Sequence, residues 1–314
     1  MREANRIPRR DFIWRSAQAA AVGGFMVGNA PGQAQQGAVG ATDAADGPLR
    51  AADVQAFLQS EGDWVDWAGG RTCDGFKYGD PAREVRGMAV AWMATMANLQ
   101  RAAELGCTLF VTHEPTFYAH MDDDPGLLAT PEAEHKRALL DEAGITVVRC
   151  HDLWDRYPQL GIVDSWAAWL ELPGEPLAHD GYYAVFDLGE RTLTDLARQV
   201  LERTRPLGQE TVDLVGDPDQ TVRRLAIGCG AITEVRRMVE LGADCCLVTD
   251  DGFCYWARGS WLLDRGTPAL VVNHAVAEEP GMRNLAQHLQ QHFPQVGVTY
   301  LQTGSFRRAV WGAR

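Results

Sequence analysis

Three apolar segments of the sequence each run directly into a histidine, and a carboxylate stands within four residues of that histidine. The pairs are His113 with Glu114, His151 with Asp155, and His274 with Glu278. Imidazole nitrogen and carboxylate oxygen are the ligands that first-row divalent metal ions use in hydrolytic sites. Since one carboxylate can bridge two ions, a few such residues can hold a pair. The residue types therefore predict a metal site that serves hydrolysis.

Any one of these histidines has an ordinary structural explanation. A single histidine at a strand end is usually exposed or hydrogen-bonded to its neighbours, and it binds no metal. Three such residues, each with an acid nearby, favour one shared site over three separate structural roles. Pro115, which follows Glu114, fixes the turn there because proline restricts the backbone of the residue before it.

The elements that position these residues follow a regular order. Apolar runs typical of buried strands alternate with segments that end at glycine, as helices do. Thr130 and Pro131, for example, predict a helix start, and Gly144 predicts its end. Strands are expected at 87–91, 107–112, 145–150, 182–188, 211–215, 224–228, 245–249 and 269–273. Helices are expected at 51–61, 95–105, 130–142, 193–204, 232–241 and 280–293.

This alternation predicts an α/β fold with two α/β lobes and mostly parallel sheets. Residues 51–172 and 266–314 are expected to form the metal-binding lobe, with residues 173–265 inserted as the second lobe. In open α/β sheets, ligands bind beyond the carboxyl ends of the strands. The three histidines follow such ends, so we expect the metal site there, in the cleft between the lobes.

The same segments, in the same order, resemble the NIF-three-like family of dinuclear metal centre hexameric proteins, also known as GTP cyclohydrolase I type 2 homologues. Thr112-His113-Glu114-Pro115 stands where the family has His-His-Pro, and residues 151–155 resemble its His-Thr-x-x-Asp. Residues 273–281 are similar to Gly-His-x-x-x-Glu-x-x-Gly, the most specific of these motifs. Residues 74–80 and 249–251 resemble two further family segments, so the similarity spans residues 74–293.

Carried over by position, the resemblance implies that His113, Asp155, His274 and Glu278 are metal ligands, with Asp155 and Glu278 as bridges between two ions. Glu114 stands in the place of the family's second histidine. An anionic oxygen in place of a neutral nitrogen should favour harder ions such as Mn, Fe(II) or Mg, and Zn remains open. A second departure lies near Tyr255, where the family commonly has a histidine.

We therefore hypothesise a metal-dependent hydrolase in which a metal-bridged hydroxide attacks an electrophilic carbon or phosphorus. His151 is a candidate proton carrier, or instead a residue that holds Asp155. The family label names GTP, yet the sequence has no Gly-Lys-Ser/Thr phosphate loop, and its negative charge favours small neutral or cationic substrates. The alternative is a non-catalytic oligomeric metal-binding scaffold. The resemblance implies a toroidal homo-hexamer in either case.

The first 34 residues have the order of a twin-arginine signal peptide. Arg9, Arg10 and Phe12 precede a mildly apolar stretch and an Ala-x-Ala-like exit that ends at Ala34. A basic N-terminal tail is the alternative interpretation. We expect export to the periplasm or the extracellular space, with residues 35–50 as a linker. The apolar stretch is too short and too rich in glycine to be a stable membrane anchor.

Charge and cysteine content argue against other classes. The net charge is −13, and it becomes −16 once residues 1–34, with a surplus of three positive charges, are removed. Such a chain is not expected to bind nucleic acid. Seven cysteines without a CxxC pair predict small buried hydrophobic residues rather than a zinc knuckle. A redox role for the adjacent Cys245 and Cys246 is the weaker alternative, because vicinal cysteines in a buried strand usually serve packing.

Overall fold

The computed structural model describes residues 47–310, and contacts group the chain from Gly47 onward into one compact unit. The predicted signal at residues 1–34 and residues 35–46 of the predicted linker lie outside the described residues. The end of that linker is structured. Val85 donates a 2.7 Å backbone hydrogen bond to the carbonyl oxygen of Leu49, whose side chain packs against the core.

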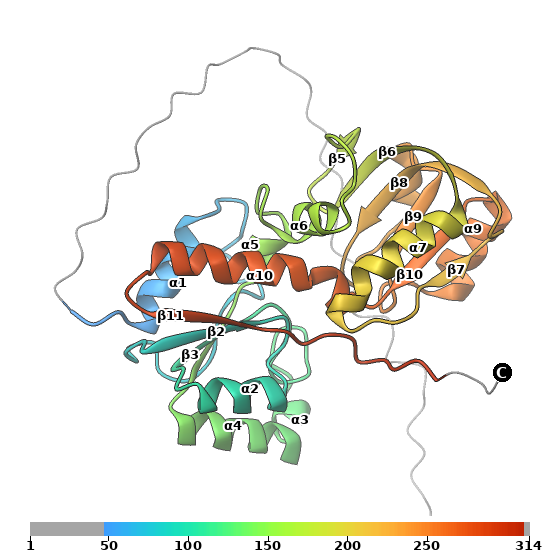
Figure 1. The fold of residues 1–314 in the computed structure, drawn as a ribbon. Helices are drawn as coiled ribbons and strands as arrows, with labels where there is room; N and C mark the ends of the chain where they lie inside the picture. The colour runs from blue at the N-terminus through green and yellow to red at the C-terminus, as the bar shows by residue number, and fades with distance from the viewer. Residues whose placement is uncertain (1–46, 311–314) are drawn as a thin grey trace, which may run out of the picture. The chain divides into compact units, whose positions relative to one another are not determined.

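The first sheet has five strands in the order β1-β4-β3-β2-β11 (Figure 1). These are β1 (Gly75–Tyr78), β2 (Gly87–Ala91), β3 (Leu109–Thr112), β4 (Thr146–Arg149) and β11 (Gly297–Leu301). All pairs are parallel except that of β1 with β4. Every residue of β2, β3 and β4 is buried, as expected for apolar strands covered on both faces. The two edge strands, β1 and β11, were not among the predicted elements.

Helices cover both faces of this sheet (Figure 1). α10 (His274–His292) lies on one face and packs against α6 (Ile162–Trp169), while α2 (Met96–Glu104) and α4 (Pro131–Ala143) lie on the other. The side chains of each strand alternate between these two layers, so a hydrophobic core lies on each face of the sheet.

The start of α4 shows how the local sequence specifies a helix. The hydroxyl of Thr130 accepts a hydrogen bond from the backbone N–H of Ala133, and Pro131 occupies the first turn. Gly144 ends the helix in the left-handed conformation, with φ of 64°. The predicted caps of this helix are confirmed.

The second sheet has six strands in the order β5-β6-β8-β9-β10-β7 (Figure 1). These are β5 (Ala178–His179), β6 (Tyr183–Thr192), β7 (Asp213–Val215), β8 (Thr221–Gly228), β9 (Cys245–Thr249) and β10 (Ala269–Val272). Its centre, β8-β9-β10, is parallel, and the outer strands pair antiparallel. α7 (Leu193–Thr204) covers one face, and α8 (Val235–Glu240) and α9 (Ser260–Arg265) cover the other. The predicted α/β class with two sheets is confirmed.

One hydrophobic core joins the two sheets, because buried residues of both belong to a single cluster. Cys245 belongs to that cluster and Cys246 to the one beneath α8 and α9, so the two side chains point to opposite faces of β9. Both are free and fully buried, which is the packing role that the sequence favours. The remaining elements of residues 47–310 are α1 (Ala51–Ser60), α3 (Pro125–Leu128), α5 (Asp152–Asp155), a 3₁₀ turn at Arg205–Leu207 and a π-helical turn at Tyr255–Gly259.

The place of β10 differs from the expectation. Residues 266–314 were assigned to the first lobe, but β10 pairs with β9 and β7 and therefore belongs to the six-stranded sheet. Only the chain after it, α10 and β11, returns to the first sheet. The division into domains 51–172 plus 266–314 and 173–265 otherwise stays a prediction.

The start of α10 also differs from the expectation. Proline favours the first turn of a helix, so the sequence predicts that the helix begins at Pro280. The helix instead begins at His274 and contains Pro280 in its interior. Its first turn is capped by a residue that is distant in sequence, since the Oδ1 atom of Asp250 accepts a 3.0 Å hydrogen bond from the backbone N–H of His274.

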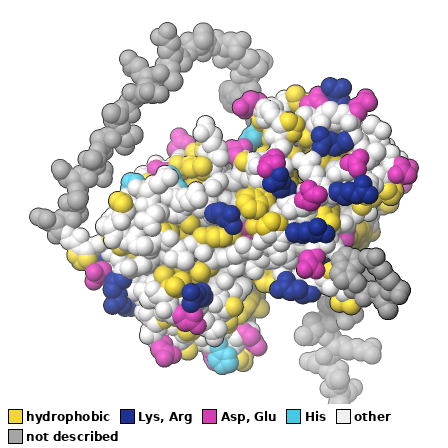
Figure 2. All heavy atoms as spheres, in the orientation of Figure 1, with side chains coloured by type: hydrophobic (Ala, Val, Ile, Leu, Met, Phe, Trp, Pro, Cys, Tyr) yellow, Lys and Arg dark blue, Asp and Glu magenta, His cyan; other side chains and the backbone are white. Residues whose placement is uncertain are grey.

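On the face shown in Figure 2, Lys and Arg side chains alternate with Asp and Glu instead of gathering into one basic patch. Within residues 47–310, each helix is either too short or too polar to cross a bilayer.

Candidate metal centre

Two neighbouring strands of the first sheet deliver the first half of the site. β3 and β4 pair in parallel, so the residues that follow them emerge at the same edge. His113 and Glu114 follow β3, and the short helix α5 after β4 carries Asp155. From β2, on the other side of β3, comes Trp92.

The second sheet delivers the other half. β10 ends at Val272, and His274 and Glu278 lie one above the other on α10, four residues apart. Trp92 donates a 2.7 Å hydrogen bond from its indole N–H to Oε2 of Glu278 and thereby links the two halves. The site therefore lies between the two sheets, at the carboxyl ends of strands from each.

The side chains form a closely spaced chain of alternating imidazoles and carboxylates. Nε2 of His113 lies 3.4 Å from Oδ1 of Asp155 and 3.3 Å from Oε2 of Glu278. Nε2 of His274 lies 2.9 Å from Oε1 of Glu278 and 3.5 Å from Oε1 of Glu114. Glu278 thus lies between the two imidazoles, with one oxygen toward each.

Both imidazoles are fixed through the other ring nitrogen. Nδ1 of His113 lies 3.0 Å from the carbonyl oxygen of Cys150, and Nδ1 of His274 lies 2.9 Å from Oδ2 of Asp251. With a proton on Nδ1, each ring directs the lone pair of Nε2 into the site. The two Nε2 atoms are buried and have no hydrogen-bond partner with good geometry among the described residues. Histidine ligands of metals are held in this way.

The spacing of these atoms fits bound cations. Two atoms bound about 2.1 Å from one ion lie about 3.0 Å apart at a right angle and about 3.4 Å apart at the tetrahedral angle. Ligand atoms of His113, Glu114 and Glu278 fall within 4.8 Å of one another, as do those of His113, His151 and Asp155. The described residues can therefore hold a divalent ion at this position.

The electrostatics of the cluster also favour bound positive charge. Burial alone would lower the pKa of His113, but the carboxylates of Glu278 and Asp155 outweigh burial and raise this pKa to about 9. Burial would likewise lower the pKa of His274, which Glu278 and Asp251 raise well above its usual value. For Glu278, burial favours a high pKa, and the two imidazoles instead hold it well below its usual range. The buried carboxylates are thus stabilised only with cations beside them, protons or metal ions.

Glu114 has a partner outside the cluster. Its Oε2 atom lies 3.3 Å from a guanidinium nitrogen of Arg149, a residue that is 1% exposed. The same guanidinium donates a 2.7 Å hydrogen bond to the carbonyl oxygen of His113 and a second one to that of His120. Arg149 therefore holds both the backbone of His113 and the carboxylate of Glu114 in place.

Asp74 fixes the loop that carries the residues after β4. One of its oxygens accepts hydrogen bonds from the backbone N–H groups of His151 and Asp152, at 2.6 and 2.9 Å, and the other accepts from Leu153 at 3.0 Å. A carboxylate at the start of a helix satisfies N–H groups that have no partner within the helix. Asp74 thereby positions the whole of α5.

A pocket of about 310 Å³ opens onto the cluster. Its apolar wall is made by Trp92, Met93, Ile162, Val163, Tyr182 and Ile232. The residues that line it include the carboxylates of the cluster together with Asp152 and Asp251, but no lysine or arginine of the described chain. Gly230 lies at its edge with φ of 78°, and a Cβ atom there would be 3.5 Å from Oε1 of Glu278. Glycine therefore keeps the space beside the cluster open.

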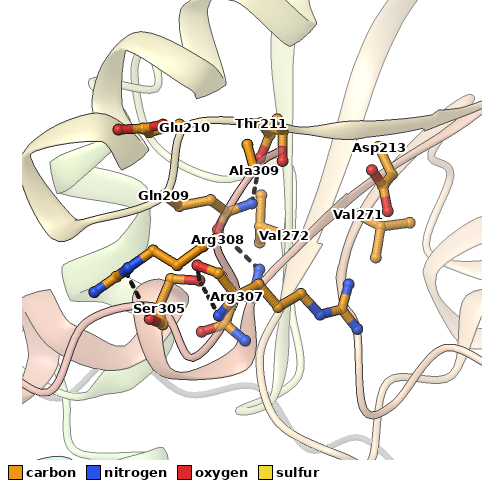
Figure 3. Close-up of a pocket in the computed structure, with 11 residues that line it drawn as sticks. Gln209, Glu210, Thr211, Asp213, Val271, Val272, Ser305, Arg307, Arg308 and Ala309 are labelled. Atoms are coloured by element: carbon orange, nitrogen blue, oxygen red, sulfur yellow. Dashed lines mark hydrogen bonds between the residues drawn. The ribbon is translucent and has the colours of Figure 1, made fainter. Parts of the chain in front are cut away.

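A second, smaller pocket is lined in part by Asn273, the residue before α10, and is shown in close-up in Figure 3. It has a volume of about 170 Å³ and lies where residues 305–309 pass the ends of β7 and β10. Arg307 at this pocket forms a 3.1 Å ion pair with Oδ2 of Asp250, whose other oxygen caps α10. The C-terminal segment thus supports the helix that carries His274.

The five predicted ligands, His113, Glu114, Asp155, His274 and Glu278, all meet at this one cluster. Tyr255 does not join them, since it is 60% exposed and does not line the pocket. Trp92, Asp74, Asp251 and Arg149 were not identified as site residues. For Asp74 and Asp251 a signal existed, because both lie in segments that resemble family motifs.

Comparison with known proteins identifies a family and a curated relative. Residues 66–304 match the model of the family Duf34/NIF3 (NGG1p interacting factor 3). Over 242 residues the chain is 25% identical to a Chlamydia pneumoniae protein named GTP cyclohydrolase 1 type 2 homolog, covering 74% of this chain and 90% of that protein.

Solved structures share the fold. A hypothetical protein of Staphylococcus aureus superposes with a TM-score of 0.70 at 19% identity, covering 84% of this chain and all of that one. A Bacillus cereus protein related to NIF3 gives a TM-score of 0.68 at 15% identity, with the same coverage. At these identities the likeness establishes the fold alone.

Proposed function

The chain belongs to the Duf34/NIF3 family, and from this premise we propose that it holds two divalent metal ions and uses them for hydrolysis. The proposed ligands are His113, Glu114, Asp155, His274 and Glu278. Asp155 and Glu278 are the proposed bridges, as the family resemblance implies, and Glu278 has one carboxylate oxygen facing each of His113 and His274.

One observation carries the proposal. The Nε2 atoms of His113 and His274 are buried and have no hydrogen bond of good geometry within residues 47–310, and both face carboxylate oxygens across 2.9 to 3.5 Å. A buried imidazole nitrogen without a hydrogen bond is costly unless something binds it. A cation between nitrogen and oxygen satisfies both groups.

Bound divalent ions would supply an acidified water molecule and stabilise the negative charge that develops during hydrolysis. The residues of the chain supply the rest. Trp92 and Arg149 fix the orientations of Glu278 and Glu114, and Asp251 fixes the tautomer of His274. The apolar wall of the pocket excludes water from one side of a substrate.

The pocket supports small neutral or cationic substrates with an apolar part. Without a lysine or arginine in its lining, a triphosphate would meet only carboxylates outside the metal ions. GTP appears in the name of the Chlamydia pneumoniae relative, and that name describes the relative and not this chain. For this chain we propose an ester, amide or lactone, whose carbonyl oxygen could face the ions while its body contacts Met93, Ile162 and Ile232.

The experiment combines metal analysis with a substrate screen. Protein purified without a histidine tag is analysed for its metals, reloaded with Mn, Fe(II), Mg or Zn, and tested on lactones, amides, phosphodiesters and GTP. We expect two ions per chain and turnover of a neutral carbonyl substrate. Turnover of GTP at ordinary enzyme rates would contradict the proposed substrate class, and protein that binds none of these ions would contradict the metal centre.

A second candidate function is a non-catalytic, oligomeric metal-binding scaffold. Its support is a group of exposed apolar side chains on the π-helical turn and α9, where Tyr255, Trp256 and Leu263 are 60%, 76% and 57% exposed. Exposed apolar patches often mark protein contacts. Light scattering on the wild type and on Trp256→Ser tests this. A hexamer that dissociates in the variant, together with no turnover in the screen, would favour the scaffold.

We also infer export, from the order of Arg9, Arg10 and the apolar stretch in residues 1–34. Fractionation of cells that express the full chain or its Arg9→Lys/Arg10→Lys variant tests this. Export of the wild type alone is expected, and equal distribution of both would contradict it.

A further inference from the structure

A third imidazole lies against the cluster. The ring of His151 stacks on that of His113, with 4.4 Å between centroids and 17° between planes. Its Nε2 atom lies 3.9 Å from Oε1 of Glu114, the same oxygen that lies 3.5 Å from Nε2 of His274. Nδ1 of His151 lies 3.4 Å from Oδ2 of Asp155. Three imidazoles and three carboxylates therefore alternate around a closed ring.

His151 is held in the same way as the two proposed histidine ligands. Its Nδ1 atom lies 3.0 Å from Oδ1 of Asp152, as Nδ1 of His274 lies 2.9 Å from Asp251. Asp152 is itself fixed, because its Oδ2 atom accepts a 2.7 Å hydrogen bond from the hydroxyl of Thr72 and a 3.3 Å one from the backbone N–H of Cys73. A carboxylate anchored in this way keeps the proton on Nδ1 and leaves the lone pair on Nε2.

We propose that His151 is a metal ligand through Nε2 and supplies the nitrogen that is missing because Glu114 stands where the family has its second histidine. The inference rests on the proposed metal centre and deepens it. The ion between Glu114, His274 and Glu278 gains a second nitrogen, and the centre as a whole has three nitrogens and three carboxylates. The 3.9 Å between Nε2 of His151 and Oε1 of Glu114 is the longest spacing in the ring. For two bonds of about 2.1 Å to one ion, it corresponds to a wide angle of about 136° between them.

This assignment replaces the proton-carrier role for His151. An imidazole that binds a metal ion through Nε2 and donates its Nδ1 proton to Asp152 has no free nitrogen. Proton transfer then falls to another group at the pocket. The hydrogen bond from Thr72 to Asp152 fits this assignment, because it holds His151 in one orientation.

Cobalt(II) serves as the probe, because the N–H protons of imidazoles bound to it give strongly shifted proton NMR signals. Each proposed histidine ligand keeps one N–H, on Nδ1. The full chain loaded with cobalt(II) in H₂O is therefore expected to give three such signals, all absent after loading in D₂O. His151→Gln should give two and bind cobalt(II) about 10-fold or more weakly. The matched control is His120→Gln, whose ring lies 6.1 Å from that of His151, and it should keep all three.

The outcomes separate the two proposals. Two signals in the stoichiometrically loaded wild type, or three in His151→Gln, would overturn the assignment of His151 and leave the metal centre standing. A chain that binds no cobalt(II) would overturn both. The wild-type count needs no variant, so the inference stays testable even if His151→Gln does not fold.

Discussion

The indole N–H of Trp92 donates a 2.7 Å hydrogen bond to Oε2 of Glu278, across 186 positions of sequence. Trp92 follows β2 of the first sheet, and Glu278 lies on α10, which begins directly after β10 of the second. The ring of Trp92 also packs edge-on against that of His274, with 5.1 Å between centroids. One side chain therefore orients two of the proposed ligands.

Trp92→Phe should weaken metal binding without unfolding the protein. Phenylalanine keeps most of the aromatic packing but cannot donate to Glu278, which then loses its fixed orientation. Loss of such a supporting hydrogen bond typically costs about 10- to 100-fold in metal affinity. A metal titration of wild type and variant measures the effect. Trp169→Phe is the control, because Trp169 also donates its indole N–H, to the carbonyl oxygen of Arg203, away from the site. An unchanged dissociation constant in Trp92→Phe would contradict the role of this hydrogen bond.

The double variant His274→Ala/Glu278→Gln should lose its bound metal and still fold. Both residues belong to one face of α10, and alanine and glutamine are good helix formers. Elemental analysis and circular dichroism measure the two outcomes. The control is Glu132→Gln/His135→Ala, a pair on the exposed side of α4. Metal retained at the wild-type ratio in the first variant would show that the ligands lie elsewhere.

Metal affinity should rise with pH between about 6.5 and 9. In the metal-free protein the pKa of His113 is raised from 6.5 to about 9, since the carboxylates of Glu278 and Asp155 outweigh burial. A metal ion must displace that proton, so binding strengthens as pH increases through this window. The stability of the metal-free protein follows the opposite course. The contribution of protonated His113 to the free energy of unfolding is fully present below pH 6.5 and is lost as pH rises through about 9.

The pH dependence of metal affinity and the pH dependence of stability can both be measured on one preparation. Apparent dissociation constants come from titrations at several pH values, and stability comes from urea unfolding in the presence of a chelator. Affinity that stays flat from pH 6 to 9 would mean that no proton leaves His113 when metal binds.

Asp74→Ala should destabilise the protein by about 3 kcal/mol, because three N–H groups at the start of α5 lose their acceptor and each costs about 1–3 kcal/mol when buried. Misplacement of α5 should also weaken metal binding through Asp155. The control is Asp80→Ala, which removes an exposed carboxylate that accepts from Ala82. Urea denaturation compares the two variants, and equal stability of both would show that α5 does not depend on Asp74.

The local sequence was sufficient to place the ligands but not to assign the sheets. His113 and His151 stand where buried parallel strands end, and a run of apolar residues shows this directly. The run Ala-Leu-Val-Val in β10 is equally suited to either sheet. A strand that is buried on both faces is apolar throughout, so its sequence does not show which strands it pairs with. Its pairing with β9 is set by contacts across the whole fold.

The start of α10 could not be predicted for a related reason. No side chain within the helix or at Asn273 caps it. The acceptor is Asp250, brought close by the end of β9 and held there by Arg307. A cap supplied by a distant segment leaves no local pattern, whereas Pro280 is a strong local signal that here lies in the helix interior. Trp92 was missed in the same way, since an isolated tryptophan after a strand is usually part of the core.

Glu114→His should shift the metal preference toward zinc. The change restores the nitrogen that the family has at this position and removes one anionic oxygen, and softer nitrogen ligands favour Zn over Mn and Mg. We expect the ratio of zinc to manganese affinity to rise about 10-fold, as measured by competition titration. The variant should also be less stable, because the buried guanidinium of Arg149 loses the carboxylate 3.3 Å away. Glu114→Gln separates the two effects: it removes the same charge without adding a nitrogen, so it should lose stability while its metal preference changes less. An equal shift of preference in both variants would show that charge, and not the ligand nitrogen, sets the choice of metal.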